Sequence, residues 1–228
     1  MATYKEIHGV KVQYRDSDAT AIEGDVWYNS STGKLRMYAA LGAWSSGGNL
    51  TTGRKSHGSA GTQTANLVYG GDGPTASQAI SETYDGSSWT EVADLNTARA
   101  NAGGTGTSST AALSFGGFRD PPPGAIAFTE LWNGTNWTEV NDMTLANNGV
   151  GGAGTSTAAL AFGGNSPRTI TQSWNGTNWS NENSLTAGTS FGIGAGTQTL
   201  ALAVSGQPPA TTAVEEWTIA QNVKVITD

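Results

Sequence analysis

Few residues in this chain have the chemistry that catalysis or metal binding requires. The two histidines, His8 and His57, lie far apart in the sequence, and the chain contains no cysteine. A zinc site would therefore need carboxylates beside these histidines, and such a mixed set is a weak one for a transition metal. We expect both histidines to be surface residues, and we predict no metal and no cofactor.

The carboxylates are also poorly placed for acid–base chemistry. Glycoside hydrolysis needs two carboxyl groups that face one bond. Glu215 and Glu216 are sequence neighbours, so along a strand they point to opposite faces. Asp16-Ser17-Asp18 is only a fragment of a calcium-binding loop, and we expect Asp16 and Asp18 to lie in a solvated loop.

The run Tyr84-Asp85-Gly86-Ser87-Ser88-Trp89 is similar to the Asp-box of sialidases, which is a structural turn. A sialidase also needs clustered arginines for the carboxylate of its substrate. The six arginines of this chain are spread singly. The sequence therefore predicts that the chain is not an enzyme, and a carbohydrate-active enzyme is kept as a second alternative.

Formal glycosylation sequons begin at Asn133, Asn136, Asn175 and Asn178, among others. Their recurrence at one repeat position is better explained by turn geometry. The segment Met1–Ile7 has no apolar region typical of a signal peptide, and no apolar run approaches the roughly 18 residues of a membrane span. We therefore expect synthesis in a cytoplasm and no insertion into a membrane.

The composition indicates a folded, glycine-rich chain. The 228 residues include 32 Gly, only 13% are charged, and the formal net charge is −7. Eight Trp, six Tyr and five Phe supply aromatic area that a disordered chain lacks. The sequence contains no run of basic residues of the kind that would indicate a nucleic-acid interface. Its length suits one all-β domain.

Internal repetition is the main signal in the sequence. Four segments end in a diglycine or its equivalent: Asn66–Gly71, Ala112–Gly117, Ala159–Gly164 and Ala201–Gly206. Each follows a Gly-Thr pair and precedes an aromatic residue, and in the first three a second aromatic follows five residues later. The tryptophans Trp44, Trp89, Trp137 and Trp179 are 45, 48 and 42 residues apart, a period typical of propeller blades.

Each repeat is predicted to hold four strands: a Gly-Thr arm, the diglycine strand, a strand ending at the first aromatic, and an outer strand starting at the second. Asn-Gly or Asp-Gly between the two aromatics is a strong hairpin signal. The diglycine supplies φ values that other residues avoid, and the aromatics are expected to pack between blades. The residues expected to hold the fold are Trp44, Gly70, Gly71, Tyr84, Trp89, Gly116, Gly117, Trp132, Trp137, Gly163, Gly164, Trp174, Trp179 and Trp217.

These patterns predict an all-β fold, a β-propeller of about five four-stranded blades. Residues 1–22 are expected to form an attachment segment and residues 23–228 the propeller. The expected blades are a partial one at 23–50 and repeats at about 51–96, 97–143, 144–185 and 186–228. The closure of the ring stays open, because Val223–Thr227 is either the outer strand of the last blade or a partner of the N-terminal piece.

A diglycine strand followed by an aromatic and then a tryptophan resembles the kelch motif, over roughly residues 50–218. The chain departs from ordinary kelch repeats in its shorter aromatic spacing and its high Gly, Ala and Thr content. Met1–Ile7 and Glu23–Leu35 resemble the start of virion structural and tail-fibre proteins of marine bacteriophages. That second resemblance implies a component of a phage particle.

The connections after the diglycine differ between repeats, at residues 72–83, 118–131, 165–173 and 207–216. Loops gathered on one face often mark a binding surface, and neutral loop drift is the alternative. The prolines Pro121, Pro122 and Pro123 restrict the second loop. The candidate contacts are Phe118, Arg119, Phe128 and Arg168.

We therefore expect a non-enzymatic virion structural protein of a fibre or particle surface, made in the host cytoplasm. The attachment segment would bind other virion proteins or sister subunits, and homo-oligomers are expected only by analogy with fibres. The loops would bind a glycan or a protein of the host surface. A capsid decoration protein that binds only the shell is the first alternative.

Overall fold

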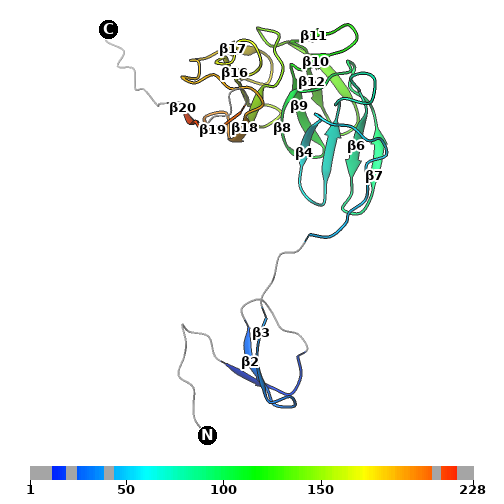
Figure 1. The fold of residues 1–228 in the computed structure, drawn as a ribbon, viewed down its shortest axis with the longest axis vertical. Helices are drawn as coiled ribbons and strands as arrows, with labels where there is room; N and C mark the ends of the chain where they lie inside the picture. The colour runs from blue at the N-terminus through cyan, green and yellow to red at the C-terminus, as the bar shows by residue number, and fades with distance from the viewer. Residues whose placement is uncertain (1–11, 19–24, 39–43, 207–211, 220–228) are drawn as a thin grey trace, which may run out of the picture. The chain divides into compact units, whose positions relative to one another are not determined.

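The computed structural model describes residues 12–18, 25–38, 44–206 and 212–219. Within these ranges the chain forms strands and turns and no helix, which confirms the predicted all-β class. Contacts divide the chain into two compact units, Met1–Ser46 and Gly47–Asp228 (Figure 1). The described part of the chain contains no helix that is long and apolar enough to cross a membrane.

The first unit is a small three-stranded sheet. Its strands are β1 (Gln13–Arg15), β2 (Val26–Asn29) and β3 (Lys34–Met37). β2 and β3 form an antiparallel hairpin, whereas β1 pairs with β2 in parallel.

This first unit crosses the domain boundary expected after residue 22. Arg15 pairs with Asp25 at 2.8 Å, and its guanidinium lies 5.4 Å from the ring centroid of Trp27. Because these contacts join both sides of that boundary, the chain divides after Ser46 instead. The parallel β1–β2 pair also distinguishes this sheet from the expected partial blade, since the repeat sheets are antiparallel throughout.

The second unit contains four sheets that follow the sequence repeats. Sheet 1 consists of β4 (Gly58–Gly61), β5 (Asn66–Tyr69), β6 (Ser81–Tyr84) and β7 (Trp89–Val92). Sheet 2 consists of β8 (Gly103–Ser108), β9 (Ala111–Phe115), β12 (Thr129–Trp132) and β13 (Trp137–Val140). Sheet 3 consists of β14 (Gly151–Gly154), β15 (Ala159–Phe162), β16 (Thr171–Trp174) and β17 (Trp179–Asn181).

Sheet 4 contains three described strands: β18 (Ile193–Gly196), β19 (Leu200–Val204) and β20 (Val214–Thr218). The expected additional strand Val223–Thr227 lies outside the described residues. A short hairpin of β10 (Phe118–Arg119) and β11 (Gly124–Ala125) projects from sheet 2. The four predicted strands per repeat are thus present in sheets 1 to 3.

The turn between the two aromatics of a repeat is fixed by its first side chain. In sheet 2, Asn133 Oδ1 accepts the backbone amides of Thr135 and Asn136, both at 2.9 Å. Gly134 follows with φ +94°, a conformation that favours glycine. Asn175 in sheet 3 makes the same two contacts, and Asp85 makes them in sheet 1.

The diglycine joins consecutive repeats. In sheet 2, Gly116 has φ +60° and a Cβ there would lie 2.6 Å from the carbonyl oxygen of Asn147. The amide of Gly117 donates to that same oxygen at 2.8 Å. Only a residue without a side chain fits this approach, so the diglycine of sheet 2 contacts the link that enters sheet 3 directly through its backbone.

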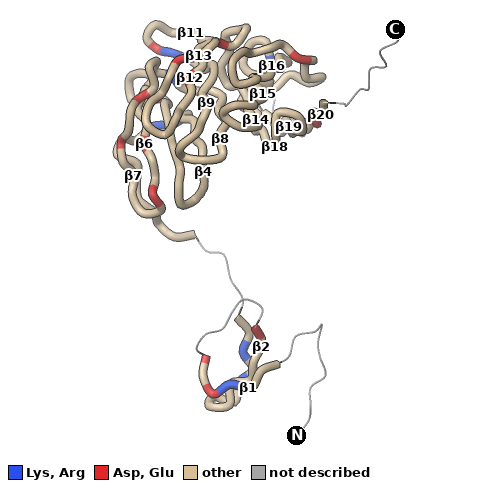
Figure 2. Tube along the Cα trace, turned by 180° about the vertical axis from the view of Figure 1, so that it is seen from behind, with Lys and Arg blue, Asp and Glu red and all other residues tan. Residues whose placement is uncertain are grey.

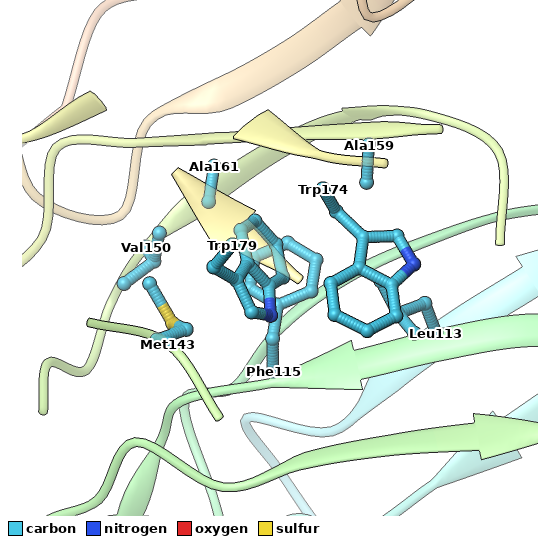
Figure 3. Close-up of a cluster of buried hydrophobic side chains, with 8 residues drawn as sticks. All are labelled: Leu113, Phe115, Met143, Val150, Ala159, Ala161, Trp174 and Trp179. Carbon is cyan, nitrogen blue, oxygen red and sulfur yellow. The ribbon is translucent and has the colours of Figure 1, made fainter. Parts of the chain in front are cut away.

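Neighbouring sheets pack in one repeated way. The diglycine strand of one sheet presents a leucine and a larger apolar residue, and the next sheet presents alanines and two tryptophans. Figure 3 shows this cluster between sheets 2 and 3, with Leu113 and Phe115 from β9 beside Trp174 and Trp179. The two tryptophan rings lie 5.5 Å apart, centroid to centroid. Such rings bury large apolar areas, of about 150–250 Å² each, and stabilise the stack of sheets.

The packing changes in sheet 4, the last sheet of the stack. Leu67, Leu113 and Leu160 are fully buried, whereas Leu202 at the same position of sheet 4 is 39% exposed. Trp44, expected to be a structural aromatic, is fully exposed. It follows no diglycine strand, so no neighbouring sheet in its own unit covers it.

The inner strands β4, β8, β14 and β18 contact one another in this order. A chain of backbone hydrogen bonds runs beside them: the amide of Asn101 donates to Ser56, that of Gly149 to Asn101, and that of Phe191 to Gly149. All four of these residues have positive φ. The four sheets therefore lie side by side in chain order, with the first strand of each sheet next to the first strand of the following one (Figure 1).

Candidate binding groove on the loop side

The two ends of each sheet differ. One end carries the short turns after the Gly-Thr arms and between the aromatics; we call it the turn side. The other end carries the connections between the second and third strands and the links between sheets; we call it the loop side. Figure 2 shows charged residues placed singly along the second unit, several of them in loop-side segments near β11.

A groove of about 430 Å³ opens on the loop side between sheets 1 and 2. Three segments line it: the 72–77 loop of sheet 1, the β10–β11 hairpin of sheet 2, and residues that precede the inner strands. The side chains that carry polar or aromatic chemistry there are Lys55, Asp72, Ser77, Asn101, Phe118, Asp120 and Asn148.

Backbone hydrogen bonds fix the walls of this groove. The amide of Ser77 donates to the carbonyl of Asp120 at 3.0 Å, and its hydroxyl lies 3.3 Å from the carbonyl oxygen of Phe118. Phe118 and Ala100 exchange two backbone hydrogen bonds of 2.7 and 2.9 Å. Lys55 and Asp72 exchange another pair, at 3.1 and 2.7 Å. The groove is therefore preformed, as ligand sites commonly are.

The side chains of the groove suit a ligand that carries many hydroxyl groups. Lys55 and two amides supply donors, while Asp72 and Asp120 supply acceptors. The half-buried ring of Phe118 adds one apolar surface beside them. A small number of polar groups that converge around an aromatic ring is typical of a binding site.

The structure places the four predicted contacts in different settings. Phe118 lines the groove. Arg119 lies on the same hairpin, but its Nε is buried without a hydrogen-bond partner. Phe128 precedes β12, and its carbonyl accepts Arg99 at 2.7 Å. Arg168 lies in the connection of sheet 3, where its carbonyl accepts the amide of Thr189 at 2.9 Å.

Sequence reasoning missed a repeated carboxylate or amide on the third strand of every sheet. In sheet 2 the carboxylate of Glu130 accepts the amides of Asn96 and Thr97, at 2.7 and 3.2 Å, in the link that enters the sheet. The guanidinium of Arg99 pairs with the same carboxylate, and both side chains are buried. The only sequence signal is an acid or amide two residues before the first aromatic of each repeat.

The same contact recurs in the other sheets. The carboxylate of Glu82 accepts the amide of Thr51 at 2.7 Å and pairs with Arg54 at 2.8 Å. Burial alone would raise the pKa of Glu82, but the hydrogen bonds from Thr51 and the charge of Arg54 outweigh it and lower the pKa. In sheet 3 the uncharged Gln172 takes this place and accepts the amide of Thr144 at 3.1 Å.

In sheet 4, Glu215 accepts the amides of Thr186 and Ala187, both at 2.8 Å. Burial would raise the pKa of Glu215, and these hydrogen bonds lower it more strongly. Its neighbour Glu216 is exposed on the other face of β20. The two carboxylates therefore lie on opposite faces, as their adjacency predicts.

The remaining candidates for chemistry have structural contacts or fall outside the described residues. Asp18 accepts Trp27 Nε1 at 3.1 Å and Asn29 Nδ2 at 2.7 Å. His57 is exposed, and His8 lies outside the described residues. Within the described ranges, no three His, Cys, Asp or Glu side chains gather as a metal site would require.

Comparisons with known proteins add no relative. A scan against models of protein families finds no match to this chain, and a search of the curated proteins finds none either.

Proposed function

We propose that the chain is a non-enzymatic binding module of a bacteriophage particle, made in the host cytoplasm and carried on a fibre or on the particle surface. In this proposal the four repeat sheets are blades of a kelch-like β-propeller. The sheet of β1–β3 is counted apart from the blades, because its β1–β2 pair is parallel and it belongs to another unit.

The observation that carries the proposal is the loop-side groove. Loops that differ between repeats meet there on a rigid scaffold, a common arrangement in binding proteins. Its lining combines the ring of Phe118 with the charged groups of Lys55 and Asp72 and the amides of Asn101 and Asn148. This combination favours a glycan of the host surface over an apolar ligand.

The first unit supports an attachment role. Tyr14 pairs with Tyr28, and Tyr28 pairs with Leu35, so these residues form a row across one face of its sheet. Tyr14, Leu35 and Met37 are largely exposed on the described surface. An exposed apolar row of this kind is typical of a protein-binding face, and other virion proteins are its proposed partners.

The test is binding of the purified, labelled chain to an array of bacterial surface polysaccharides. Lys55→Gln and Asp72→Asn keep the size of the groove side chains and remove their charges. We expect each to weaken binding of the recognised glycan by about tenfold, which corresponds to one charged hydrogen bond. Glu91→Gln, on the exposed side of β7, is the matched control.

Three outcomes distinguish the alternatives. Binding that the groove variants lose and the control keeps supports a glycan-binding propeller. If the groove variants bind the glycan as well as the unchanged chain does, the contact lies elsewhere and the proposed site is wrong. A folded chain that binds no glycan and no host cell, but binds isolated phage capsids, would favour the decoration role.

A further inference from the structure

The interface between sheets 1 and 2 contains a tryptophan in a defined setting. The indole Nε1 of Trp137 donates to the hydroxyl of Ser81 at 3.0 Å. Its ring lies edge-on to Tyr69, with centroids 4.8 Å apart, and 5.4 Å from the ring of Trp132. The outer strand of one sheet therefore inserts an indole against the sheet before it.

The interface between sheets 2 and 3 repeats this setting at every contact. Trp179 Nε1 donates to Thr129 Oγ1 at 3.0 Å. The ring of Trp179 lies edge-on to Phe115, at 5.0 Å, and 5.5 Å from Trp174. Three partners thus define the indole position: a hydroxyl, an aromatic edge and a second tryptophan.

The interface between sheets 3 and 4 contains the same three partners without the indole. By repeat position they are Thr171, Phe162 and Trp217. The residue five positions after Trp217 is Asn222, whereas a tryptophan stands at this place in sheets 1 to 3. The interface between sheets 3 and 4 therefore has all three partners of the indole. The sequence has no tryptophan at the repeat position that provides the indole in the other two interfaces.

The structure has a pocket at this place. Its volume is about 220 Å³, and its apolar walls include Leu160, Phe162, Ala201, Ala203 and Trp217. Thr171 also lines it, is only 3% exposed, and its Oγ1 has no hydrogen-bond partner. A buried hydroxyl without a partner is unfavourable, so a donor that enters this pocket gains a contact that is already in position.

We propose that this pocket binds an indole group with a free N–H. The N–H donates to Thr171 Oγ1, and the ring lies in a T-shaped contact with Phe162 and tilted against Trp217, as in the two filled interfaces. The pocket is distinct from the loop-side groove, and the inference does not rest on the proposed function. A small indole compound and the tryptophan side chain of a partner strand are the two sources of this group.

Ligand-observed NMR on the full chain tests the proposal, with indole as the first probe and 1-methylindole as its control. Methylation removes the N–H donor and keeps the ring. We expect saturable binding of indole, and binding of 1-methylindole weaker by about tenfold because one hydrogen bond is lost. No saturable binding of indole at about 1 mM, or equal binding of the two probes, overturns the proposal.

Two variants locate the site. Thr171→Val keeps the shape of the side chain and removes the acceptor, so indole binding should weaken by about tenfold. Thr129→Val makes the same change in the filled interface and should leave indole binding unchanged. If these two variants bind indole equally well, the pocket is not the site. Circular dichroism and urea unfolding confirm that each sample is folded.

A pair of larger probes completes the test. N-acetyltryptophanamide and a peptide copying residues 173–182 distinguish the sources: tighter binding of the peptide indicates a partner strand, and equal binding indicates a small indole.

Discussion

The guanidinium of Arg99 pairs with the carboxylate of Glu130, and both side chains are almost completely buried. Arg99 belongs to the link that enters sheet 2, and Glu130 belongs to β12. The same two repeat positions hold Arg54 and Glu82 at sheet 1, with an N–O distance of 2.8 Å. At sheet 3 they hold the neutral Asn147 and Gln172. At sheet 4 they hold the neutral Thr189 with Glu215, so the carboxylate occurs there without an arginine, whereas Arg54 and Arg99 each have their carboxylate.

Glu130→Gln tests this pairing. The substitution leaves the charge of Arg99 buried without its counter-ion, and breaking such a buried pair costs about 3–5 kcal/mol. We expect a loss of that size in the free energy of unfolding of the second unit, measured with urea. Glu91→Gln at an exposed position should change it by no more than about 0.5 kcal/mol. Equal stability of the two variants would show that the pair contributes little.

The diglycine predicts a second stability effect. Gly116 has φ +60°, and a Cβ there would lie 2.6 Å from the carbonyl oxygen of Asn147. Gly116→Ala should therefore destabilise the chain by at least about 2 kcal/mol, through the left-handed backbone and the clash. Thermal or urea unfolding measures the loss.

The fourth repeat supplies the reverse substitution as a control. Ser205 stands where the other repeats have their first glycine, and it has φ +48°. Ser205→Gly should raise the free energy of unfolding by up to about 1 kcal/mol, because it removes the cost of that conformation. A loss of stability in Ser205→Gly, or none in Gly116→Ala, would contradict the role given to the backbone conformation.

The turn of sheet 1 predicts a pH effect. Hydrogen bonds from the amides of Ser88 and Ser87 lower the pKa of Asp85 from 3.8 to about 2. Because the pKa is lower in the folded chain, this carboxylate stabilises the fold above pH 3.8 and loses that effect as the pH falls toward 2. Asp85→Asn should remove this pH dependence and keep the turn, since Asn133 and Asn175 hold the equivalent turns.

Urea unfolding between pH 2 and about 5 measures the Asp85 effect. The stability of the natural chain should fall more steeply with decreasing pH than that of Asp85→Asn, and the two curves should run parallel above about pH 4. Identical slopes over the whole range would mean that the carboxylate keeps its ordinary pKa in the fold.

The sequence predicts those parts of the fold that depend on neighbouring residues. Asn133-Gly134 specifies a turn, and Gly116-Gly117 specifies a strand end, because backbone conformation there is set locally. The spacing of Trp132 and Trp137 gives the register of one hairpin. These local rules recur in every repeat, so the all-β class and the repeat sheets follow from them.

Contacts between distant residues were not predictable in the same way. Glu130 accepts a hydrogen bond from the amide of Asn96, which is 34 positions away in the sequence. No local sequence pattern around either residue predicts this contact. The loop-side groove combines Lys55, Asp72 and Phe118 from separate segments. The sequence therefore identifies Phe118 as a loop residue but does not predict which residues lie beside it. Trp44 fits the repeat spacing but lacks a preceding diglycine strand, and it is exposed.

The central claim is that the loop-side groove binds a ligand of the host surface. The direct measurement is saturable binding of the labelled chain to a panel of marine bacteria, compared with a double variant, Lys55→Gln with Phe118→Leu. This variant leaves β12 and Glu130 intact, whereas replacement of the whole 118–131 segment would remove them. We predict saturable binding to some strains that the double variant loses by at least about tenfold. Undiminished binding of a folded double variant would contradict the claim.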